Sequence, residues 1–236
     1  MRSVRIIGPG RAGTSLALAL AGVGWDVAPT LGRGDDARAA AHGVDLLLLA
    51  TPDAAVAEVA AAVEPDADAV VAHVSGSLGL TPLRGHPRPA VVHPLVALPD
   101  AERGAQRVVG AWFGIAAEGD PAISAVVDAL RGRAIPVAEA DWVGYHAAAV
   151  IAANHLVALL GQVERVAGSI GAPLEAYLDL ARGALDDVAA LGPAGALTGP
   201  VRRGDRATVA RHLAGLPEAE RPAYKALSAE AARLCP

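Results

Sequence analysis

The sequence predicts an α/β protein, in which a doubly wound, mostly parallel sheet is followed by an all-α C-terminal domain. The chain opens with a hydrophobic run, a glycine-rich turn and a helical pattern in immediate succession. Short apolar runs then alternate with helical segments up to about residue 139, which is typical of a parallel sheet. Beyond residue 140 there are no β-branched runs, and the pattern is rich in Ala and Leu. We therefore expect domains at residues 1–139 and 140–236.

The turn after the first strand has the spacing G-x-G-x-x-G. Its residues are Gly8, Pro9, Gly10, Arg11, Ala12 and Gly13. The first glycine permits a tight turn, the second lets a pyrophosphate approach the backbone, and the third lets the helix pack closely on the sheet. Exposed amides and the positive end of the helix favour a bound phosphate. A strand, this turn and a helix together predict a Rossmann-type dinucleotide site, although a tight turn that binds nothing has the same local pattern.

The end of the second strand indicates which dinucleotide is bound. We expect this strand at Trp25–Ala28, and in this architecture an acid at its end would bind the 2′-hydroxyl of NAD. The chain has Pro29 and Thr30 there instead, with Arg33 close by. A guanidinium suits a 2′-phosphate better than a free hydroxyl, so we expect NADP, with NAD as the alternative. Arg33 could otherwise be a solvated loop residue.

Polar residues follow the next apolar runs, where the carboxyl ends of parallel strands line the ligand crevice. Thr51 and Pro52 follow the run Val44–Ala50, and we expect them to contact the ribose and nicotinamide. Asp53 can cap the following helix, 54–63. Ser75 and Gly76 follow the run 69–74, and His93 ends the run beginning at Val91. We expect these three residues to contact substrate, although each type also occurs in loops for structural reasons.

Composition excludes several classes of protein. The formal net charge is −5 with no basic block, which argues against nucleic acid as the main partner. We expect a cytoplasmic protein without a membrane span, because 53% of residues are hydrophobic but no uninterrupted apolar run is long enough. The single cysteine, Cys235, has no partner for an intramolecular disulfide. His73 and His93 lack metal-ligand spacing, so we expect no metal site.

The chain between residues 108 and 168 completes the sheet and starts the second domain. We expect strands at 108–116 and 134–137, around a helix at 122–130. Asp141 can cap a helix of about 25 residues that ends near Gly168. On a regular helix His146 and Asn154 would lie on one face with Val150, because each is 40° from it at 100° per residue. Polar groups on an alanine-rich face suggest a cleft, although bonds to a neighbouring loop would also explain them.

The remaining chain is predicted to be helical around one structured loop. We expect helices from Pro173 to about Leu191 and from about Pro222 to Leu234, with Asp205 capping a shorter one that ends at Leu213. The glycines and prolines of residues 191–205 indicate a loop of fixed shape. The apolar helical surface exceeds what this part of the chain needs to cover itself, so we expect a homodimer formed through these helices.

Several short motifs together resemble a known family. In order they are the glycine turn, Thr51-Pro52-Asp53, His73-x-Ser75-Gly76, His93-Pro94-Leu95, Tyr145-His146-Ala147-Ala148-Ala149 with Asn154, and Ala196 to Asp205. The chain is similar to the Rossmann-like proteins that carry a DUF2520 C-terminal domain, within the 6-phosphogluconate dehydrogenase-like superfamily. The resemblance implies an NADP-binding domain, a helical substrate and dimerisation domain, and a cleft between them.

The resemblance also implies site residues. Many β-hydroxyacid dehydrogenases of the superfamily have a lysine four residues before an asparagine; if Asn154 is that asparagine, Val150 occupies the lysine's place. His146 is then the expected proton donor, with Asn154 orienting the substrate. Contacts to substrate are expected from Ser75, Gly76, His93, Thr198 and Arg203. The implied reaction is hydride transfer between NADP and a small carboxylated carbonyl or imine compound, for example a 2-oxo acid such as ketopantoate. A non-catalytic NADP-binding sensor and an F420-dependent NADP oxidoreductase are the alternatives.

Overall fold

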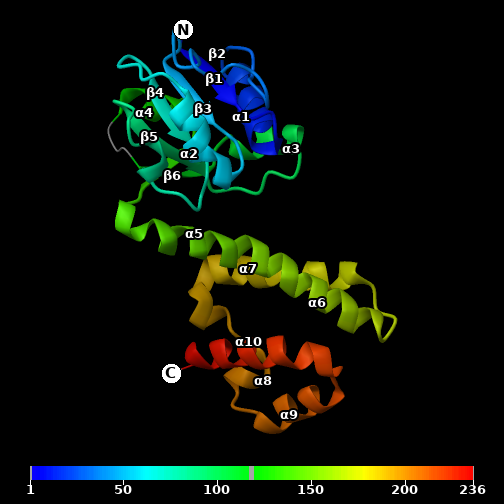
Figure 1. Ribbon diagram of the computed structural model, residues 1–236. Coiled ribbons are helices and arrows are strands. Elements are labelled where there is room, and N and C mark those ends of the chain that lie inside the picture. Colours follow the sequence, from blue (N-terminus) through cyan, green and yellow to red (C-terminus); the bar gives the residue numbers. More distant parts are fainter. Residues whose placement is uncertain (1, 117–119, 236) are drawn as a thin grey trace. The chain divides into compact units, whose positions relative to one another are not determined.

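The computed structural model describes residues 2–116 and 120–235. The chain divides into two compact units, Met1–Ala153 and Asn154–Pro236 (Figure 1). The first unit contains the sheet and its covering helices, together with the start of the long helical segment. The second unit is entirely helical among the residues described.

The first unit is built on one seven-stranded sheet with the order β2-β1-β3-β4-β5-β6-β7. Its strands are β1 (Ser3–Ile7), β2 (Asp26–Val27), β3 (Leu46–Leu49), β4 (Val70–His73), β5 (Pro89–Pro94), β6 (Trp112–Ala116) and β7 (Arg133–Pro136). Every neighbouring pair is parallel except β5 and β6, which are antiparallel. The predicted doubly wound, mostly parallel sheet is confirmed.

Helices cover both faces of this sheet. They are α1 (Arg11–Gly22), α2 (Asp53–Ala62), α3 (Ala101–Val108), α4 (Pro121–Ala129) and α5 (Trp142–Val150), with short 3-10 turns at Thr81–Leu83 and Glu139–Asp141. Because successive side chains of a strand point to opposite faces, Leu46 and Leu48 belong to one core cluster and Leu47 and Leu49 to another. Strands buried on both faces explain why β3 is a continuous apolar run.

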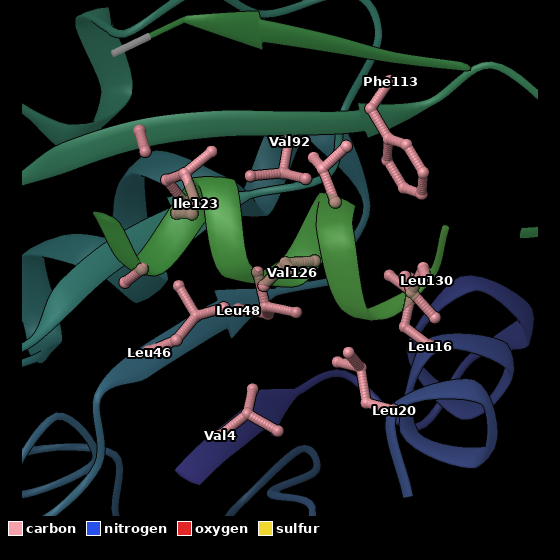
Figure 2. Close-up of a cluster of buried hydrophobic side chains, with 14 of the residues drawn as sticks. Val4, Leu16, Leu20, Leu46, Leu48, Val92, Phe113, Ile123, Val126 and Leu130 are labelled. Atoms are coloured by element: carbon pink, nitrogen blue, oxygen red, sulfur yellow. The ribbon is translucent and has the colours of Figure 1, made fainter. Parts of the chain in front are cut away.

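The larger core lies between the sheet and the helices α1 and α4. Figure 2 shows Ile123 and Val126 of α4 packed over the strands that carry Val4, Leu46 and Leu48. Leu16 and Leu20 of α1 and Phe113 of β6 join the same buried cluster. This packing holds the strand, turn and helix at residues 3–22 on a rigid base.

The segment before β6 differs from the prediction. We expected a strand from Val108, whereas residues 101–108 form α3 and the strand starts at Trp112. Asp100 caps α3, its carboxylate accepting a hydrogen bond from the Arg103 amide at 2.8 Å. Gly104 packs against α1, since a Cβ at this position would lie 2.0 Å from the Ser15 hydroxyl oxygen. A tertiary contact with α1 therefore helps to stabilise α3, a helix that the charged local sequence did not predict.

The second unit consists of short and long helices. They are α6 (Leu156–Gly168), α7 (Leu174–Ala196), α8 (Gly199–Arg202), α9 (Arg206–Gly215), a 3-10 turn at Glu218–Glu220, and α10 (Arg221–Arg233). The predicted loop at 191–205 is thus partly helical, with a kink at Gly192, where φ is 72°. The predicted cap at Asp205 is confirmed, because its carboxylate accepts a hydrogen bond from the Thr208 amide at 3.0 Å.

Few residues of the second unit are buried within the described chain. They are Ala167 and Glu220. The Glu220 carboxylate forms an ion pair with Arg165 at 2.6 Å, and the Gln162 side chain donates to the Glu220 carbonyl at 2.8 Å. These contacts join α6 to the turn before α10, but they leave most apolar side chains of the unit at its surface.

The helical segment from Glu139 to Gly168 is not a regular α-helix throughout. Residues Ile151–His155 form a π-helical turn, and the division between the two units falls inside it. The predicted cap at Asp141 is wrong, since its side chain makes no capping hydrogen bond. This segment contains an 18-residue window with a mean hydropathy of 1.5 and is the one described helix long and apolar enough to cross a membrane, by length and composition only. One such helix is weak evidence for a span, because core helices of other proteins meet the same criterion.

Candidate functional site

A pocket of about 560 Å³ lies over the glycine turn of the first unit. Its lining comes from the turn after β1, the segment after β2 and the carboxyl end of β3. From the predicted cofactor site it includes Gly8, Pro9, Gly10, Arg33, Thr51 and Pro52. Three segments far apart in sequence therefore meet at the carboxyl edge of the sheet, where doubly wound folds bind their ligands.

The three glycines of the turn meet different requirements. Gly8 has φ of 113°, and a Cβ there would lie 2.6 Å from the Ala50 carbonyl oxygen. A Cβ at Gly13 would lie 2.0 Å from the Gly8 carbonyl oxygen. At Gly10 an added Cβ would meet nothing within 4 Å. The protein's own packing thus requires Gly8 and Gly13, whereas Gly10 borders open space that a bound group could occupy.

The first turn of α1 presents uncapped amides beside this space. The N-cap is Gly10, which makes no side-chain capping bond, and no acidic side chain lies in the first turn. The first helical bond is donated by Thr14 to the Gly10 carbonyl at 2.9 Å. The amides of Arg11, Ala12 and Gly13 therefore have no acceptor one turn back, as at any helix start. Such a terminus suits an anionic phosphate.

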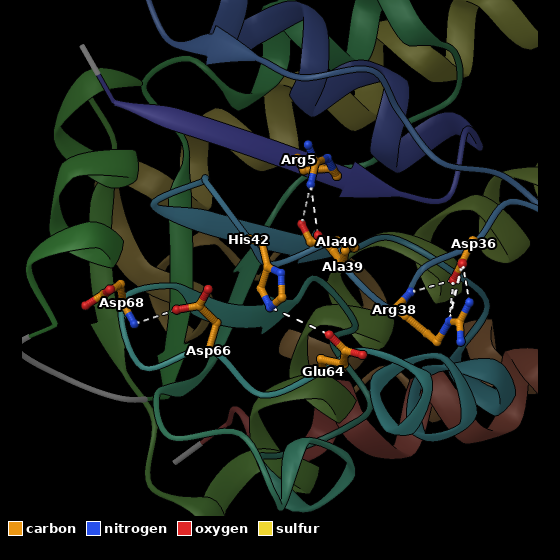
Figure 3. Close-up of polar contacts among 9 residues, drawn as sticks. All are labelled: Arg5, Asp36, Arg38, Ala39, Ala40, His42, Glu64, Asp66 and Asp68. Atoms are coloured by element: carbon orange, nitrogen blue, oxygen red, sulfur yellow. Dashed lines mark hydrogen bonds and ion pairs between the residues drawn. The ribbon is translucent and has the colours of Figure 1, made fainter.

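Arg33 lines the pocket and differs from two other arginines of the first unit. Figure 3 shows Arg5 donating to the carbonyls of Ala39 and Ala40, and Arg38 paired with Asp36. Those two guanidinium groups are therefore occupied. Arg33 is exposed, lines the pocket and makes no hydrogen bond or ion pair within the described part of the chain. Two acids, Asp35 and Glu58, also line the pocket, and the Asp35 carboxylate accepts a hydrogen bond from the Gly32 amide at 2.7 Å.

The residues after β3 reach the edge of the site. The Thr51 hydroxyl is buried and has no hydrogen-bond partner among the described residues, although Thr51 lines the pocket. The predicted cap at Asp53 is wrong, because Pro52 is the N-cap of α2. The Asp53 carboxylate instead accepts a hydrogen bond from the Ser77 hydroxyl, which lies beside the Ser75 hydroxyl at 3.2 Å. This contact holds the loop after β4 close to the end of β3.

His73 has both ring nitrogens committed to the backbone. Its Nδ1 accepts from the Ser75 amide at 3.3 Å, so its Nε2 is protonated and donates to the Gly79 carbonyl at 2.9 Å. Burial lowers its pKa, which favours this neutral form. His73 is therefore a structural residue that shapes the loop carrying Ser75 and Gly76.

A second group of polar side chains gathers over Gly76. A Cβ at this position would lie 2.5 Å from His146 Nδ1 and 2.6 Å from His93 Nε2. On its other side, His93 Nδ1 is 2.8 Å from the Tyr145 hydroxyl. Burial, with a smaller effect from His146, lowers the pKa of His93 to about 4. The structure thus brings together Gly76, His93 and His146 from three separate segments of the first unit, and His93 is neutral near pH 7.

Tyr145 is a residue whose contact the sequence did not reveal. Its ring packs with Trp142 over Val91 and Ala116 and so anchors α5 to the sheet. The feature of the sequence that could have indicated this contact is the position of Tyr145 next to a histidine near the start of a long helix. Among the described residues, no group of three His, Cys, Asp or Glu side chains is arranged to hold a metal ion.

The other predicted site residues lie in the second unit. Asn154 is exposed and stands within the π-helical turn, so the regular rotation that would place it on one face with His146 does not apply. Thr198 is exposed at the start of α8 and lines a pocket of about 280 Å³ with residues of α6 and α10. Arg203 is exposed just after α8.

Solved structures of similar fold include three with informative descriptions. A Bacteroides fragilis protein provisionally described as an NADP oxidoreductase is 22% identical, with a TM-score of 0.80 and 98% of both chains covered. An Aspergillus terreus reductive aminase, in complex with NADPH and ethyl-5-oxohexanoate, is 16% identical, with a TM-score of 0.71 and 99% of this chain and 94% of that one covered. A Plasmodium falciparum pyrroline carboxylate reductase with NADP bound is 13% identical, with a TM-score of 0.65, covering 99% and 98%.

These TM-scores show that the chain shares its fold with the three proteins. Among curated proteins the chain has no match. The family described as "Domain of unknown function (DUF2520)" matches residues 111–231, just over half of the chain, from the last two strands of the sheet to α10. The chain therefore belongs to the DUF2520 family.

Proposed function

We propose that this protein is an NADP-dependent oxidoreductase that transfers a hydride between nicotinamide and a small carboxylated carbonyl or imine compound. A 2-oxo acid such as ketopantoate is one candidate substrate. The observation that carries the proposal is the pocket over Gly8 and Gly10, where an uncapped helix start faces open space. The reductive aminase and the pyrroline carboxylate reductase, described as complexes with NADPH and NADP, support the same cofactor class.

In this proposal the residues of the first unit hold the dinucleotide by its phosphates and ribose. The amides of Arg11, Ala12 and Gly13 would bind the pyrophosphate, and the Thr51 hydroxyl would gain the partner that it lacks among described residues. When bound, the nicotinamide supplies the hydride chemistry. The protein supplies position and proton transfer.

Arg33 is proposed to bind the 2′-phosphate. We expect Arg33→Ala to raise the Kd for NADPH by about tenfold or more, because a charge-assisted hydrogen bond is worth about 1.5–3 kcal/mol. The Kd for NADH should change by less than about threefold, since it has no 2′-phosphate for the guanidinium to bind. Fluorescence titration of both nucleotides measures this difference. An equal loss for both would mean that Arg33 does not select NADP.

His146 is proposed to donate the proton that the alkoxide or amine acquires as the hydride is transferred. An imidazole can carry a proton on a ring nitrogen and release it to a bound reactant, which suits general acid catalysis. We expect His146→Ala to lower kcat by about 100-fold or more, with the Kd for NADPH changed less than threefold. A panel of 2-oxo acids and cyclic imines, with NADPH oxidation followed by absorbance, supplies the assay.

Each outcome of that assay has a clear meaning. Equal losses of turnover and NADPH affinity would make His146 a structural residue. NADPH binding without oxidation across the whole panel would favour the non-catalytic sensor.

The remaining substrate contacts are proposed from the family resemblance. Asn154 is proposed to orient the substrate, and its polar end is proposed to contact Ser75, Gly76, His93, Thr198 and Arg203.

We further propose that residues 140–236 form a substrate and dimerisation domain. The large apolar side chains Leu180, Leu185 and Leu191 of α7 are 71%, 54% and 63% exposed. Exposed apolar surface of this extent on one helix calls for a covering partner, and a second copy of the chain is the simplest. Sedimentation equilibrium should therefore report the mass of two chains. A monomer at micromolar concentration would contradict the dimer without affecting the cofactor site.

A further inference from the structure

The contacts around Gly76 point to a second role for His93 and to a role for Tyr145, which the proposed function does not use. His93 lies between Tyr145 and His146, with its ring 5.6 Å from the tyrosine ring and 6.0 Å from the histidine ring, measured between centroids. The interplanar angles are 88° and 80°, so both neighbours meet His93 edge to face. His93 Nδ1 faces the Tyr145 hydroxyl, which lies 2.8 Å away.

Gly76 brings the two imidazole rings toward the same point. His146 Nδ1 and His93 Nε2 each lie within 2.6 Å of the position that a Cβ of residue 76 would take. The absence of a side chain at residue 76 thus leaves room for the two nitrogens to approach each other, although they form no hydrogen bond with each other in this structure. His146 Nδ1 is buried and has no hydrogen-bond partner within the described chain, whereas buried polar atoms are normally paired.

We propose that His93, held by Tyr145, is a positioning residue that hydrogen-bonds the inward nitrogen of His146 and favours the protonated form of that imidazole. The outer nitrogen of His146 would then be the one that delivers a proton. The delivery rests on the proposed function, whereas the hydrogen bond between the two imidazoles does not.

The network can accommodate either charge state of His146. When His146 is neutral, the Tyr145 hydroxyl can donate to His93 Nδ1, and His93 Nε2 can donate to the lone pair of His146 Nδ1. When His146 is protonated, both bonds reverse, and His93 accepts from His146 Nδ1 while donating to the Tyr145 oxygen. A hydrogen bond to a charged donor is stronger than one between neutral groups, so the network favours the protonated state.

This arrangement requires His93 and Tyr145 to stay neutral, and their surroundings meet that requirement. Burial lowers the pKa of His93 to about 4 and raises the pKa of Tyr145. The other titratable groups that act on His93 are Asp53 from α2 and His73 from β4. His73 is neutral with both nitrogens bonded, and the Asp53 carboxylate is bonded to Ser77, so neither replaces His93 as the partner of His146.

The test is an NMR titration of the imidazole resonances of the full chain, which needs neither substrate nor cofactor. We expect His93→Leu to lower the pH midpoint of the His146 resonance by about 1 pH unit or more, because the acceptor for its charged form is lost. His93→Gln, which retains an acceptor oxygen, should restore most of the change. Tyr145→Phe should give an intermediate shift, and the exposed His42→Gln should give none.

A midpoint that stays in place or rises in His93→Leu would overturn the proposal. If that variant does not fold, Gly76→Ala provides a second test, since its Cβ would separate the two rings and should lower the same midpoint. An unchanged midpoint in folded Gly76→Ala would also overturn it. NADPH titration of the wild-type protein, run in parallel, tests the proposed function separately, because its failure would leave the midpoints unchanged.

Discussion

Gly10→Ala is expected to raise the Kd for NADPH by about tenfold or more and to change the free energy of unfolding by less than about 1 kcal/mol. The backbone angles at Gly10, φ −78° and ψ −176°, are accessible to alanine, and the added Cβ would meet no protein atom within 4 Å. The new methyl group would project into the space where the proposed pyrophosphate approaches the backbone. Fluorescence titration with NADPH and urea denaturation measure the two quantities.

Gly13→Ala is the matched control within the same turn. Its Cβ would lie 2.0 Å from the Gly8 carbonyl oxygen, and backbone atoms cannot move aside as the end of a side chain can. We expect a loss of about 3 kcal/mol or more in the free energy of unfolding, at the upper end of overpacking effects. Wild-type affinity for NADPH in Gly10→Ala, or equal destabilisation by both substitutions, would contradict the assignment of this turn to a bound dinucleotide.

Acid is expected to destabilise the first unit through His93. The pKa of this side chain falls from an ordinary value of 6.5 to about 4, mainly because of burial. Between these two pH values the unfolded chain binds the proton and the folded protein does not, so stability is present above pH 6.5 and lost as the pH falls toward 4. The loss attributable to His93 is about 3 kcal/mol. The pKa of His73 is lowered as well, which acts in the same direction.

Urea denaturation at pH 7, 5.5 and 4 measures this dependence. His93→Gln has no titrating group and should therefore lose less stability than the wild-type protein over the same range. The exposed His42→Gln should follow the wild-type protein. Parallel curves for His93→Gln and wild type would show that His93 is not the group responsible.

Patterns local in sequence were sufficient for the sheet and the glycine turn. The continuous apolar run at β3 and the glycines at residues 8, 10 and 13 reflect requirements met by adjacent residues or by burial on both faces of a sheet. The missed helix α3 depended on a packing contact between Gly104 and α1, which no local pattern encodes. The π-helical turn at Ile151–His155 was equally invisible, because its sequence suits a regular helix.

The sequence alone predicted the fold class, the alternation of strands and helices along the first unit, and the position of the glycine turn, since each depends on the pattern of neighbouring residues. Only the tertiary structure decided that Asp53 bonds Ser77 rather than capping its helix, and that His93, Tyr145 and His146 gather over Gly76. Asp53 and Ser77 are 24 positions apart in the chain, and His93 and Tyr145 are 52 positions apart. Their contacts arise from the way the strands align and the helix α5 packs on them, which is a property of the whole domain.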